Sequence, residues 1–561
     1  MARDGMVTSA NPLASEAGVA MLRAGGNAID AAVATAFALG VVEPQMSGLG
    51  GSGAAMVWLA GSSRPVYLDF YAAQFADSWR GSAALKPAPE GTPRDPRDLR
   101  GVGIPGEVAG LLALHEKHGA LTREQVLAPA VMLAEQGYPV GKILADFIEG
   151  GEAKMKLYPP ATKLYLPGGK PLRPGAIVVN PELAESLRRI SRDGARGFYE
   201  GPTATAIVSA LNAGGHPSTL RDMAGYAPQW KEPLCTDYRG HTVLSAPPPQ
   251  TGMRVLHTLE LLEGFDLDAL GLPTRSAAGF DVLTSALRVG QAGASRNGDP
   301  NWMSVPARGI SSDAFAATRR PLVGTRAARA EIPRADAGSF ESTPPTASCA
   351  ALLKAAPSPA REMPAAFGGP DEMPDDTTGE TTHLSVVDPA GNAVALTVTN
   401  SSVWGSGAFV AGFFLNDSGF RFTEKNIDDP SSSQWRIRTT TIAPTIVLKE
   451  GAVQMVIGAP GAGRIPTEIV QVMVYTLDYG LDPLDAVRMP RIFATSANPQ
   501  VQVEHGFTPE LLRDVRTMGY DPVTESSGYA RLYIVVRQGD RWIGVADPRH
   551  DGQPRGYDAD R

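Results

Sequence analysis

The most regular pattern of apolar and polar positions in this chain lies between residues 382 and 399. The two kinds of residue alternate through 382–388, a turn follows at Pro389-Ala390-Gly391-Asn392, and alternation resumes from 393 to 399. Successive side chains of a strand point to opposite faces, so alternation on both sides of a turn predicts a β-hairpin. We therefore expect two paired strands here.

Helical patterns dominate the beginning of the chain. Residues 9–25 indicate the end of a strand followed by a capped helix, and the Ala-rich residues 28–39 predict a second helix that can approach a sheet closely. A further helix is expected over 251–263, after the rigid turn Pro247-Pro248-Pro249. Helices and alternating strands recur without regular βαβ spacing, which favours packed layers over a barrel.

The character of the sequence changes between about residues 330 and 380. Prolines, acidic residues and small residues replace the periodic apolar ones, and no helix or strand pattern persists. Such a segment cannot bury enough apolar surface to order itself. It is therefore predicted to be a flexible linker that is suited to being cut.

A strand begins directly behind this linker with Thr381. A threonine hydroxyl is a poor nucleophile unless a base lies beside it, and the α-amine of the same residue can be that base, with a pKa near ~7.7. Thr381 gains a free amine only if its hydroxyl attacks the carbonyl of Glu380 and the resulting ester is hydrolysed. The alternative is an ordinary hairpin, since threonine favours strands.

Composition narrows the class of protein. The chain has 561 residues, 43% of them hydrophobic and 20% charged, and a net charge of −8, which indicates a globular chain with an ample core. The acidic balance and the lack of a basic run argue against nucleic-acid binding. Cys235 and Cys349 give neither metal-ligand spacing nor a disulfide framework, although a single bridge between them stays open.

No stretch of the sequence indicates a membrane or secretory segment. The first six residues lack the apolar core of a signal peptide, and the longest apolar stretch, 31–42, is too short to span a bilayer. We therefore expect a cytoplasmic protein, with a periplasmic one as the alternative if a leader has been trimmed.

Two motifs suggest ligands at first sight. His115 and His118 lie one helical turn apart, but with no third ligand nearby we expect a solvated helix face and no metal. Gly48, Gly50 and Gly53 satisfy G-x-G-x-x-G, but a helical pattern precedes them and a strand-like one follows, the reverse of a dinucleotide site. No cofactor is predicted.

Residues 381–395, T-T-H-L-S-V-V-D-P-A-G-N-A-V-A, resemble the start of the small subunit of the γ-glutamyltranspeptidases, which are N-terminal nucleophile hydrolases. The resemblance extends in order from Gly5 to about Pro522. It implies an α/β (α+β) fold, a four-layer αββα sandwich. Residues 1–380 are then a large subunit and 381–561 a small subunit, cut from one precursor and sharing one core.

The resemblance also implies the catalytic machinery. Thr381 is the nucleophile, Thr399 holds its amine, and the turn at Gly461 and Ala462 supplies the backbone N–H groups of an oxyanion hole. Ala462 stands where the family has a second glycine, which keeps the N–H but restricts the backbone. The hydroxyls of Thr440 and Thr441 match a Ser-Ser segment that binds the acyl end, and Asn400 and Ser401 are both candidates for a substrate contact.

Two positions depart from the family. Tyr71 stands where the γ-glutamyl enzymes have an arginine that grips the α-carboxylate of the substrate, and tyrosine is no bidentate cation. Arg421 stands where an aspartate binds the α-amino group, so the charge is reversed. The short connection after Thr423, ending near Arg438, further suggests that the lid loop of some relatives is absent and the site is open.

We therefore predict an autoprocessed amidohydrolase that acts through an acyl-enzyme on a small-molecule amide, with water or an amine as acceptor. The two departures point toward members of the superfamily that act on carboxyl-bearing acyl groups, such as cephalosporin acylases and oxamate amidohydrolases. The alternatives are a true γ-glutamyltransferase or glutathione hydrolase, and an inactive relative that serves as a binding protein.

Overall fold

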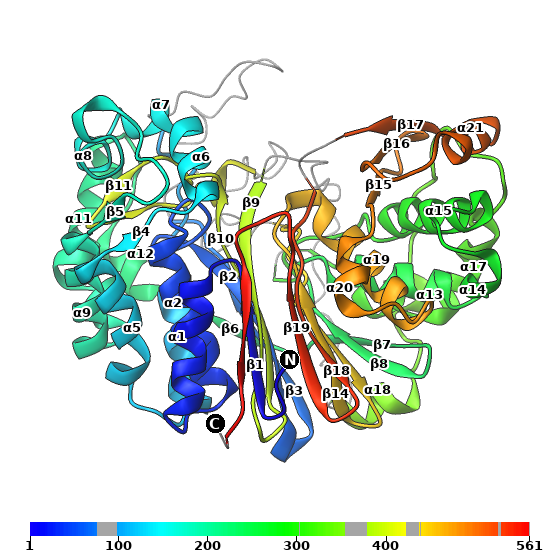
Figure 1. The fold of residues 1–561 in the computed structure, drawn as a ribbon, viewed down its shortest axis with the longest axis horizontal. Helices are drawn as coiled ribbons and strands as arrows, with labels where there is room; N and C mark the ends of the chain where they lie inside the picture. The colour runs from blue at the N-terminus through cyan, green and yellow to red at the C-terminus, as the bar shows by residue number, and fades with distance from the viewer. Residues whose placement is uncertain are drawn as a thin grey trace.

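The computed structural model describes residues 1–75, 98–301, 303–353, 379–421, 437, 439–525 and 529–559. Two large β-sheets lie face to face between two layers of helices (Figure 1). The predicted four-layer αββα sandwich is therefore confirmed. Within the described residues, no helix is both long and apolar enough to cross a membrane.

The first sheet has seven strands, and the two predicted hairpin strands pair at its centre. Its order is β20 (Gln553–Tyr557), β1 (Gly5–Ser9), β9 (Gly379–Val387), β10 (Ala393–Ser402), β2 (Ser52–Leu59), β3 (Arg64–Phe70) and β6 (Gln229–Lys231). Strands β9 and β10 belong to the predicted small subunit, and β1 and β2 on either side of them belong to the large one. Every described neighbour pair in this sheet is antiparallel.

The second sheet has six strands. Its order is β19 (Arg541–Ala546), β18 (Tyr533–Gln538), β14 (Ala452–Gly458), β13 (Thr445–Lys449), β8 (His241–Ser245) and β7 (Leu234–Tyr238). It too combines strands from both sides of residue 380. A three-stranded sheet of β15 (Ile492–Ala494), β16 (Gln500–Val503) and β17 (Asp521–Thr524) lies beyond it, and short pairs are formed by β4 (Tyr138–Pro139) with β5 (Ile177–Val178) and by β11 (Phe409–Val410) with β12 (Phe413–Phe414).

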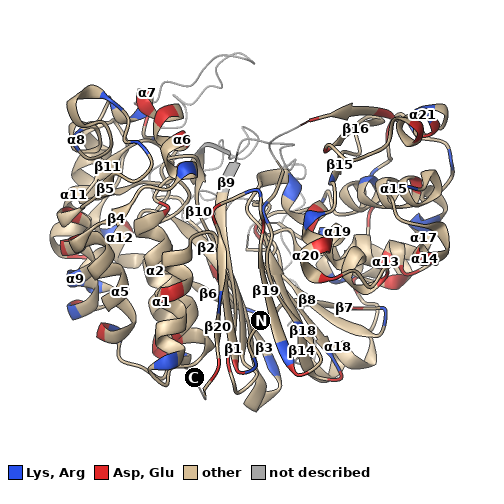
Figure 2. Cartoon of the chain, in the orientation of Figure 1, with Lys and Arg blue, Asp and Glu red and all other residues tan. Residues whose placement is uncertain are grey.

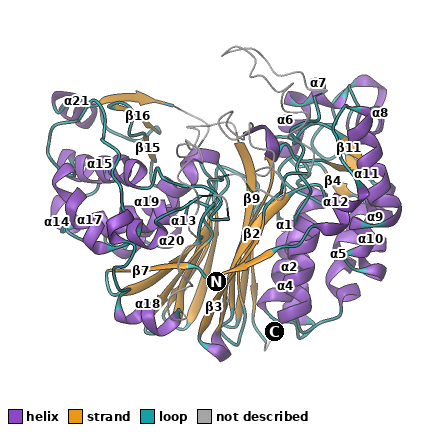
Figure 3. Ribbon diagram, turned by 180° about the vertical axis from the view of Figure 1, so that it is seen from behind, coloured by secondary structure: helices purple, strands orange, loops and turns teal. Residues whose placement is uncertain are grey.

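Each sheet is covered on its outer face by helices, and Figure 3 shows both helical layers from behind. The first layer contains α1 (Pro12–Arg23), α2 (Ala28–Val42), α4 (Glu107–His118), α5 (Arg123–Gln136), α6 (Lys142–Gly150), α7 (Glu152–Met155), α8 (Pro159–Tyr165), α9 (Pro181–Asp193), α10 (Arg196–Tyr199), α11 (Gly201–Ala213) and α12 (Leu220–Gly225). The second contains α13 (Gly252–Leu262), α14 (Leu267–Leu270), α15 (Ala277–Gly293), α16 (Ala307–Ile310), α17 (Asp313–Arg319), α19 (Ile465–Leu477), α20 (Pro483–Arg488) and α21 (Pro509–Thr517). Basic and acidic residues are interspersed over both layers (Figure 2).

Strand β9 illustrates how alternation places side chains in this sandwich. Leu384 and Val386 are fully buried in the core between the first sheet and its helices. His383 points the other way, toward the second sheet, where a Cβ on Gly458 of β14 would lie 2.2 Å from its ring. Thr381 shares the parity of His383 and so belongs to the face between the sheets.

The segment that was predicted to be a linker is partly built into the fold. Its residues up to 353 include a short helix, α18 (Ala347–Leu352), whose Cys349 forms a disulfide with Cys235 of β7, with the two Cα atoms 5.7 Å apart. The pairing that the sequence left open is therefore present. The rest of the segment, residues 354–378, lies outside the described part of the chain.

Candidate active site

Thr381 lies at an irregularity in the pairing of β9 with β10. Thr382 is opposite Val398 and Glu380 is opposite Ser401, so Thr381 faces two residues of β10, Thr399 and Asn400. One extra residue on one strand is a β-bulge, which bends the strand and re-aims its side chains. The peptide chain is continuous through Glu380 and Thr381, so this geometry belongs to the uncut precursor.

The bulge brings the hydroxyls of Thr381 and Thr399 together. The Oγ1 of Thr381 donates a hydrogen bond to the Oγ1 of Thr399 at 3.2 Å, and the backbone N–H of Ser401 donates to the same oxygen at 2.7 Å. Thr381 and Thr399 are 6% and 1% exposed. The pair that the sequence predicted to work together, 18 residues apart, is therefore in direct contact.

A chain of neutral hydroxyls continues from this point. Ser401, which has a left-handed backbone with φ of 74°, places its Oγ 3.2 Å from the hydroxyl of Tyr71 and 2.6 Å from the Oγ of Ser418. Tyr71 directly follows β3, and Tyr226 donates to its backbone oxygen at 2.9 Å. Tyr71, Ser401 and Ser418 are all buried and all uncharged.

Asn400 points away from this chain of hydroxyls. Its Nδ2 donates to the oxygen of Pro44 at 3.2 Å, and its backbone N–H donates to the oxygen of Met46 at 2.7 Å, which ties the bulge to the loop before β2. Of the two candidates for a substrate contact, Ser401 is thus the one that lies beside Tyr71.

The turn that was predicted to form the oxyanion hole has an unusual backbone conformation. Gly461 and Ala462 both have positive φ values, 131° and 51°. A short 3₁₀ helix, η8 (Ala462–Arg464), lies against β9 and leads into α19, so the N-terminal end of a helix dipole faces this region. Left-handed geometry at Ala462 costs roughly 1–2 kcal/mol that a glycine would not incur.

Thr440 and Thr441 precede β13. The backbone N–H of Thr440 donates to the oxygen of Pro249 at 3.2 Å, and the hydroxyl of Thr251 donates to the oxygen of Thr440. Thr440 is buried and Thr441 half-buried. Neither threonine makes a described hydrogen bond to Thr381, so their predicted role at the acyl end stays a prediction.

Three predicted features fall partly or wholly outside what the structure describes. Glu380 is the residue on the N-terminal side of the predicted cut, and Arg421 is the last residue of the 3₁₀ helix η5 (Ser418–Arg421). Only the backbone of these two residues is described. The connection in which a lid was expected to be missing falls mostly in residues 422–436 and 438, which are not described.

Sequence reasoning missed three polar residues near the nucleophile. Ser418 lies three residues before Arg421, in a region where the sequence drew attention only to the charge of that arginine. Glu107 begins α4, where burial strongly raises the pKa of its carboxyl group although the N–H of Gly48 donates to it at 3.3 Å. His383 is two residues from Thr381, and burial lowers its pKa to about 3. A polar residue inside an apolar pattern was the only signal for the last two.

The neutral ring of His383 has a defined set of partners. Ser385 donates its hydroxyl to the oxygen of Tyr533 at 2.8 Å, so it can accept from Nε2 of His383 at 3.1 Å. Nδ1 of His383 then accepts from the hydroxyl of Thr397 at 2.8 Å. These bonds hold the ring between the two sheets beside the nucleophile.

Known proteins are similar to this chain over nearly its whole length. The family profile described as gamma-glutamyltranspeptidase matches residues 14–557. The chain is 30% identical to the glutathione hydrolase proenzyme of Escherichia coli over 99% of its own length and 92% of the relative, and 30% identical to the acylase ACY 1 proenzyme of Pseudomonas sp. SE83 over 98% and 93%.

A solved structure matches over almost the whole fold. The cephalosporin acylase of Bacillus halodurans superposes with a TM-score of 0.83 at 27% identity, covering 99% of this chain and 96% of that one. Together with the family profile and the arrangement around Thr381, these matches show that the chain belongs to the gamma-glutamyltranspeptidase family of N-terminal nucleophile hydrolases and is an amide-processing enzyme.

Proposed function

We propose that this protein is an autoprocessed N-terminal threonine amidohydrolase that prefers a carboxyl-bearing acyl group without an α-amine. The observation that carries the preference is Arg421, which stands where the γ-glutamyl enzymes have an aspartate for the α-amino group, so its positive charge repels an ammonium and attracts a carboxylate. The chain of hydroxyls formed by Tyr71, Ser401 and Ser418 supports it, because Tyr71 stands where those enzymes have an arginine and binds Ser401 instead.

Maturation begins with attack of Thr381 Oγ1 on the carbonyl carbon of Glu380. The C–N bond of that peptide breaks, the acyl group passes from nitrogen to oxygen, and the nitrogen becomes the α-amine of Thr381. Water then hydrolyses the ester, which restores the hydroxyl and leaves a carboxylate on Glu380. Thr399, whose oxygen accepts from the Thr381 hydroxyl, supports this step by orienting the nucleophile.

Turnover then uses the new amine as the general base. The amine takes the proton of Oγ1 as the oxygen attacks the substrate amide, and the N–H groups of Gly461 and Ala462 stabilise the negative charge on the tetrahedral intermediate. The leaving amine departs with the proton, and water releases the acyl group from the ester.

A substitution at the nucleophile tests the reaction class. Thr381→Ala removes the attacking oxygen, so the purified variant is expected to stay full length and to lack amidase activity. Mass spectrometry of the wild type should find a fragment beginning Thr-Thr-His-Leu. Residual turnover by Thr381→Ala, or an active wild type without this fragment, contradicts the assignment.

A substrate panel tests the preference separately. We expect higher kcat/KM for glutaryl-p-nitroanilide than for γ-glutamyl-p-nitroanilide, which differ in the α-amino group. Arg421→Asp should shift the ratio toward the γ-glutamyl substrate, because an aspartate attracts its α-ammonium group, whereas Arg421→Gln is the matched control that removes only the positive charge. A wild type that prefers the γ-glutamyl substrate contradicts the acylase preference but not the amidohydrolase.

The second candidate is a γ-glutamyltransferase or glutathione hydrolase. It is favoured by the match to the Escherichia coli glutathione hydrolase proenzyme, which is as close in identity as the match to the Pseudomonas acylase. The same panel, with glutathione added, distinguishes the two.

The compartment is a separate proposal. The disulfide between Cys235 and Cys349 favours the periplasmic alternative over the cytoplasmic one, because disulfides persist in oxidising compartments. Fractionation of the native host, followed by detection of the small subunit, tests this.

A further inference from the structure

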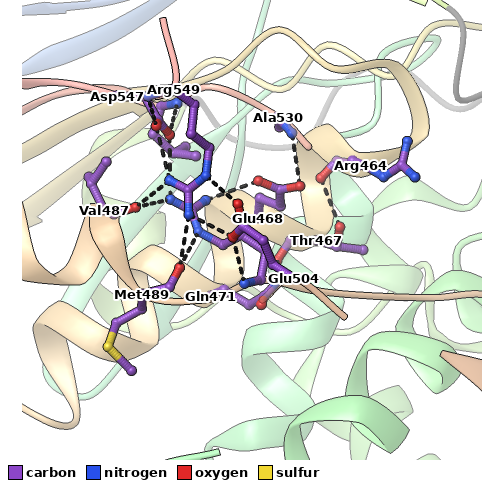
Figure 4. Close-up of polar contacts among 12 residues, drawn as sticks. Arg464, Thr467, Glu468, Gln471, Val487, Met489, Glu504, Ala530, Asp547 and Arg549 are labelled. Carbon is purple, nitrogen blue, oxygen red and sulfur yellow. Dashed lines mark hydrogen bonds and ion pairs between the residues drawn. The ribbon is translucent and has the colours of Figure 1, made fainter. Parts of the chain in front are cut away.

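A buried carboxylate lies directly behind the proposed oxyanion turn. Glu468 is in the first turn of α19, which begins after Arg464, and its side chain is 0% exposed. One carboxylate oxygen, Oε1, accepts the backbone N–H of Ala530 at 2.9 Å. Figure 4 shows this bond among the polar contacts of the region.

The turn at Gly461 and Ala462 packs against Ala530. A Cβ on Gly461 would lie 2.6 Å from the Cα of Ala530, so the two backbones are in close contact. The next residue, Arg531, donates its backbone N–H to the oxygen of Pro460 at 3.2 Å. Residues 530 and 531 therefore form a wall that fixes the turn from behind.

The second oxygen of Glu468 anchors it to a rigid group of charges. Oε2 accepts from Nη1 of Arg491 at 3.0 Å, and Arg491 also donates to the oxygens of Val487 and Met489. Asp547 lies 3.5 Å from the same guanidinium and accepts the backbone N–H of Leu532 at 3.1 Å. It therefore fixes the residue that directly follows the wall.

The far side of this group of charges is formed by Arg549 and Glu504. Arg549 binds Glu504 through two hydrogen bonds of 2.6 Å and approaches Asp547 at 3.0 Å. Three carboxylates thus share two guanidinium groups; Glu468, Arg491 and Asp547 are fully buried, whereas Arg549 and Glu504 are partly exposed. Burial raises the pKa of Glu468 to about 7, although Arg491 and the N–H of Ala530 oppose the shift.

We propose that Glu468, anchored by Arg491, is a positioning residue that holds Gly461 and Ala462 in place through Ala530. The inference rests on the proposed role of this turn as the oxyanion hole. Donors that stabilise a developing charge act well only when they are already in position, and a misplacement of about 1 Å can cost on the order of 100-fold in rate. Substrate binding in the ground state does not depend on these donors to the same extent.

The test compares steady-state constants of variants that are folded and fully cleaved. Glu468→Asp keeps the charge that Arg491 needs but shortens the reach to Ala530, whereas Glu468→Gln keeps an acceptor for the Ala530 N–H but turns an NH2 group toward Arg491. We expect kcat to fall about 10-fold or more in Glu468→Asp with KM changed by less than about threefold, and we expect Glu468→Gln to lower the melting temperature and to lose less kcat than Glu468→Asp.

Glu504→Gln is the matched control. It weakens the pair with Arg549 in the same group of charges but leaves the contact with Ala530, so its melting temperature should fall while kcat stays within about threefold of the wild type. Unchanged kcat in Glu468→Asp overturns the inference, as does an equal loss of kcat in Glu504→Gln. A wild type that cleaves no amide refutes the proposed function instead, so the two failures are distinguishable.

Discussion

Thr399 presents one oxygen to two donors, the hydroxyl of Thr381 and the backbone N–H of Ser401. The second bond stabilises the left-handed backbone of Ser401, which in turn places the serine hydroxyl beside Tyr71. A single side chain therefore connects the nucleophile with the residues proposed to select the acyl group.

Thr399→Val is expected to impair both stages of the reaction. Valine keeps the shape of threonine but removes the oxygen, so the Thr381 hydroxyl loses its partner and the bulge loses a hydrogen bond. We expect kcat to fall roughly 10- to 100-fold, together with slower cleavage of the precursor. The rate of appearance of the small subunit on a gel and the steady-state constants measure both effects.

Thr399→Ser is the control for this substitution, because it retains the oxygen. It should stay near the wild type. Equal losses in the valine and serine variants contradict the assigned role of the hydroxyl.

Glu107 is a carboxyl group whose pKa is raised well above its usual value by burial, which favours the neutral form. Its Oε2 accepts from Gly48, while its Oε1 makes no hydrogen bond within the described residues. The Oδ1 of Asn400 is also buried and unpaired there, and both side chains lie against Gly51, whose Cβ would be 2.8 Å from Oε2 of Glu107 and 3.0 Å from Oδ1 of Asn400. A protonated Glu107 is therefore suited to donate toward Asn400.

Glu107→Gln should be tolerated if the carboxyl group is neutral. Glutamine has nearly the same shape and can both accept and donate, so we expect a loss of less than about 1 kcal/mol. Glu107→Ala opens a cavity and should cost about 2–4 kcal/mol. Thermal unfolding of the two variants beside the wild type measures this, and equal destabilisation by both shows that the charged form is the native one.

Much of the site could be predicted residue by residue, but not its geometry. Thr381 was predicted from a hydroxyl that begins a strand behind a linker, whereas Thr399, Gly461 and Ala462 were predicted only from the resemblance to the γ-glutamyltranspeptidases. The β-bulge could not be predicted, because the extra residue lies in the partner strand β10 and the alternation of β9 is unchanged. Ser418 was missed because a serine in a loop gains meaning only from its neighbours in space.

Among the elements, those with a strong period were predicted closely. The helix expected over 28–39 is α2, and the one expected over 251–263 is α13. Asn27 caps α2 by accepting the N–H groups of Ile29 and Asp30, which explains why the break at Gly25-Gly26-Asn27 marks its start. Helix α18 was not predicted, because its sequence has no helical period. Its place in the fold is fixed by a disulfide between two cysteines 114 residues apart.

The disulfide fastens α18 to β7 close to the end of the described large subunit. Cys235 and Cys349 both precede the proposed cut before Thr381, so the bond closes a loop within the proposed large subunit before and after cleavage. A cross-link of this span stabilises mainly by limiting the unfolded chain, by roughly 4–5 kcal/mol in the chain-entropy description.

Replacement of both cysteines by serine is expected to lower the melting temperature by several degrees without changing kcat, because the bond lies outside the proposed catalytic groups. Differential scanning calorimetry of the variant, and of the wild type with and without reductant, measures this. A variant that melts with the oxidised wild type contradicts the stabilising role.

For the whole molecule, several buried histidines favour neutral pH. Burial lowers the pKa of His257, His383 and His550 to about 3 and that of His216 to about 4. The unfolded chain binds protons at these sites below a pH of about 6.5, whereas the folded one does not. Each group therefore contributes stability that is present above that pH and is lost as pH falls, by roughly 1.4 kcal/mol per pH unit.

These histidines lower the melting temperature between pH 7 and pH 5, whereas the raised pKa values of the buried carboxyl groups of Glu107, Glu260 and Glu468 oppose that fall. His257→Leu should narrow the difference, because the variant has no proton to gain at this site, although its ring also packs on Phe315 with centroids 4.9 Å apart. Melting curves at the two pH values measure the difference for wild type and variant. An unchanged difference contradicts the contribution of His257.

The layered architecture could be predicted, whereas the order of strands could not. Recurrent helices and strands without βαβ spacing favoured layers, and resemblance specified the sandwich. Strand β1 lies between β20 and β9 because it pairs with residues far away in the sequence. The local alternation of apolar and polar residues carries no information about such pairings.

The interleaving of strands from both sides of residue 380 has a consequence for the proposed mature enzyme. Because β9 and β10 are bonded on both flanks to strands of the other fragment, the fragments cannot separate without breaking the central sheet. When two mature preparations, one labelled with a heavy isotope, are incubated together, no molecule that combines a labelled with an unlabelled fragment should form. Each fragment therefore stays with the fragment that was translated in the same chain.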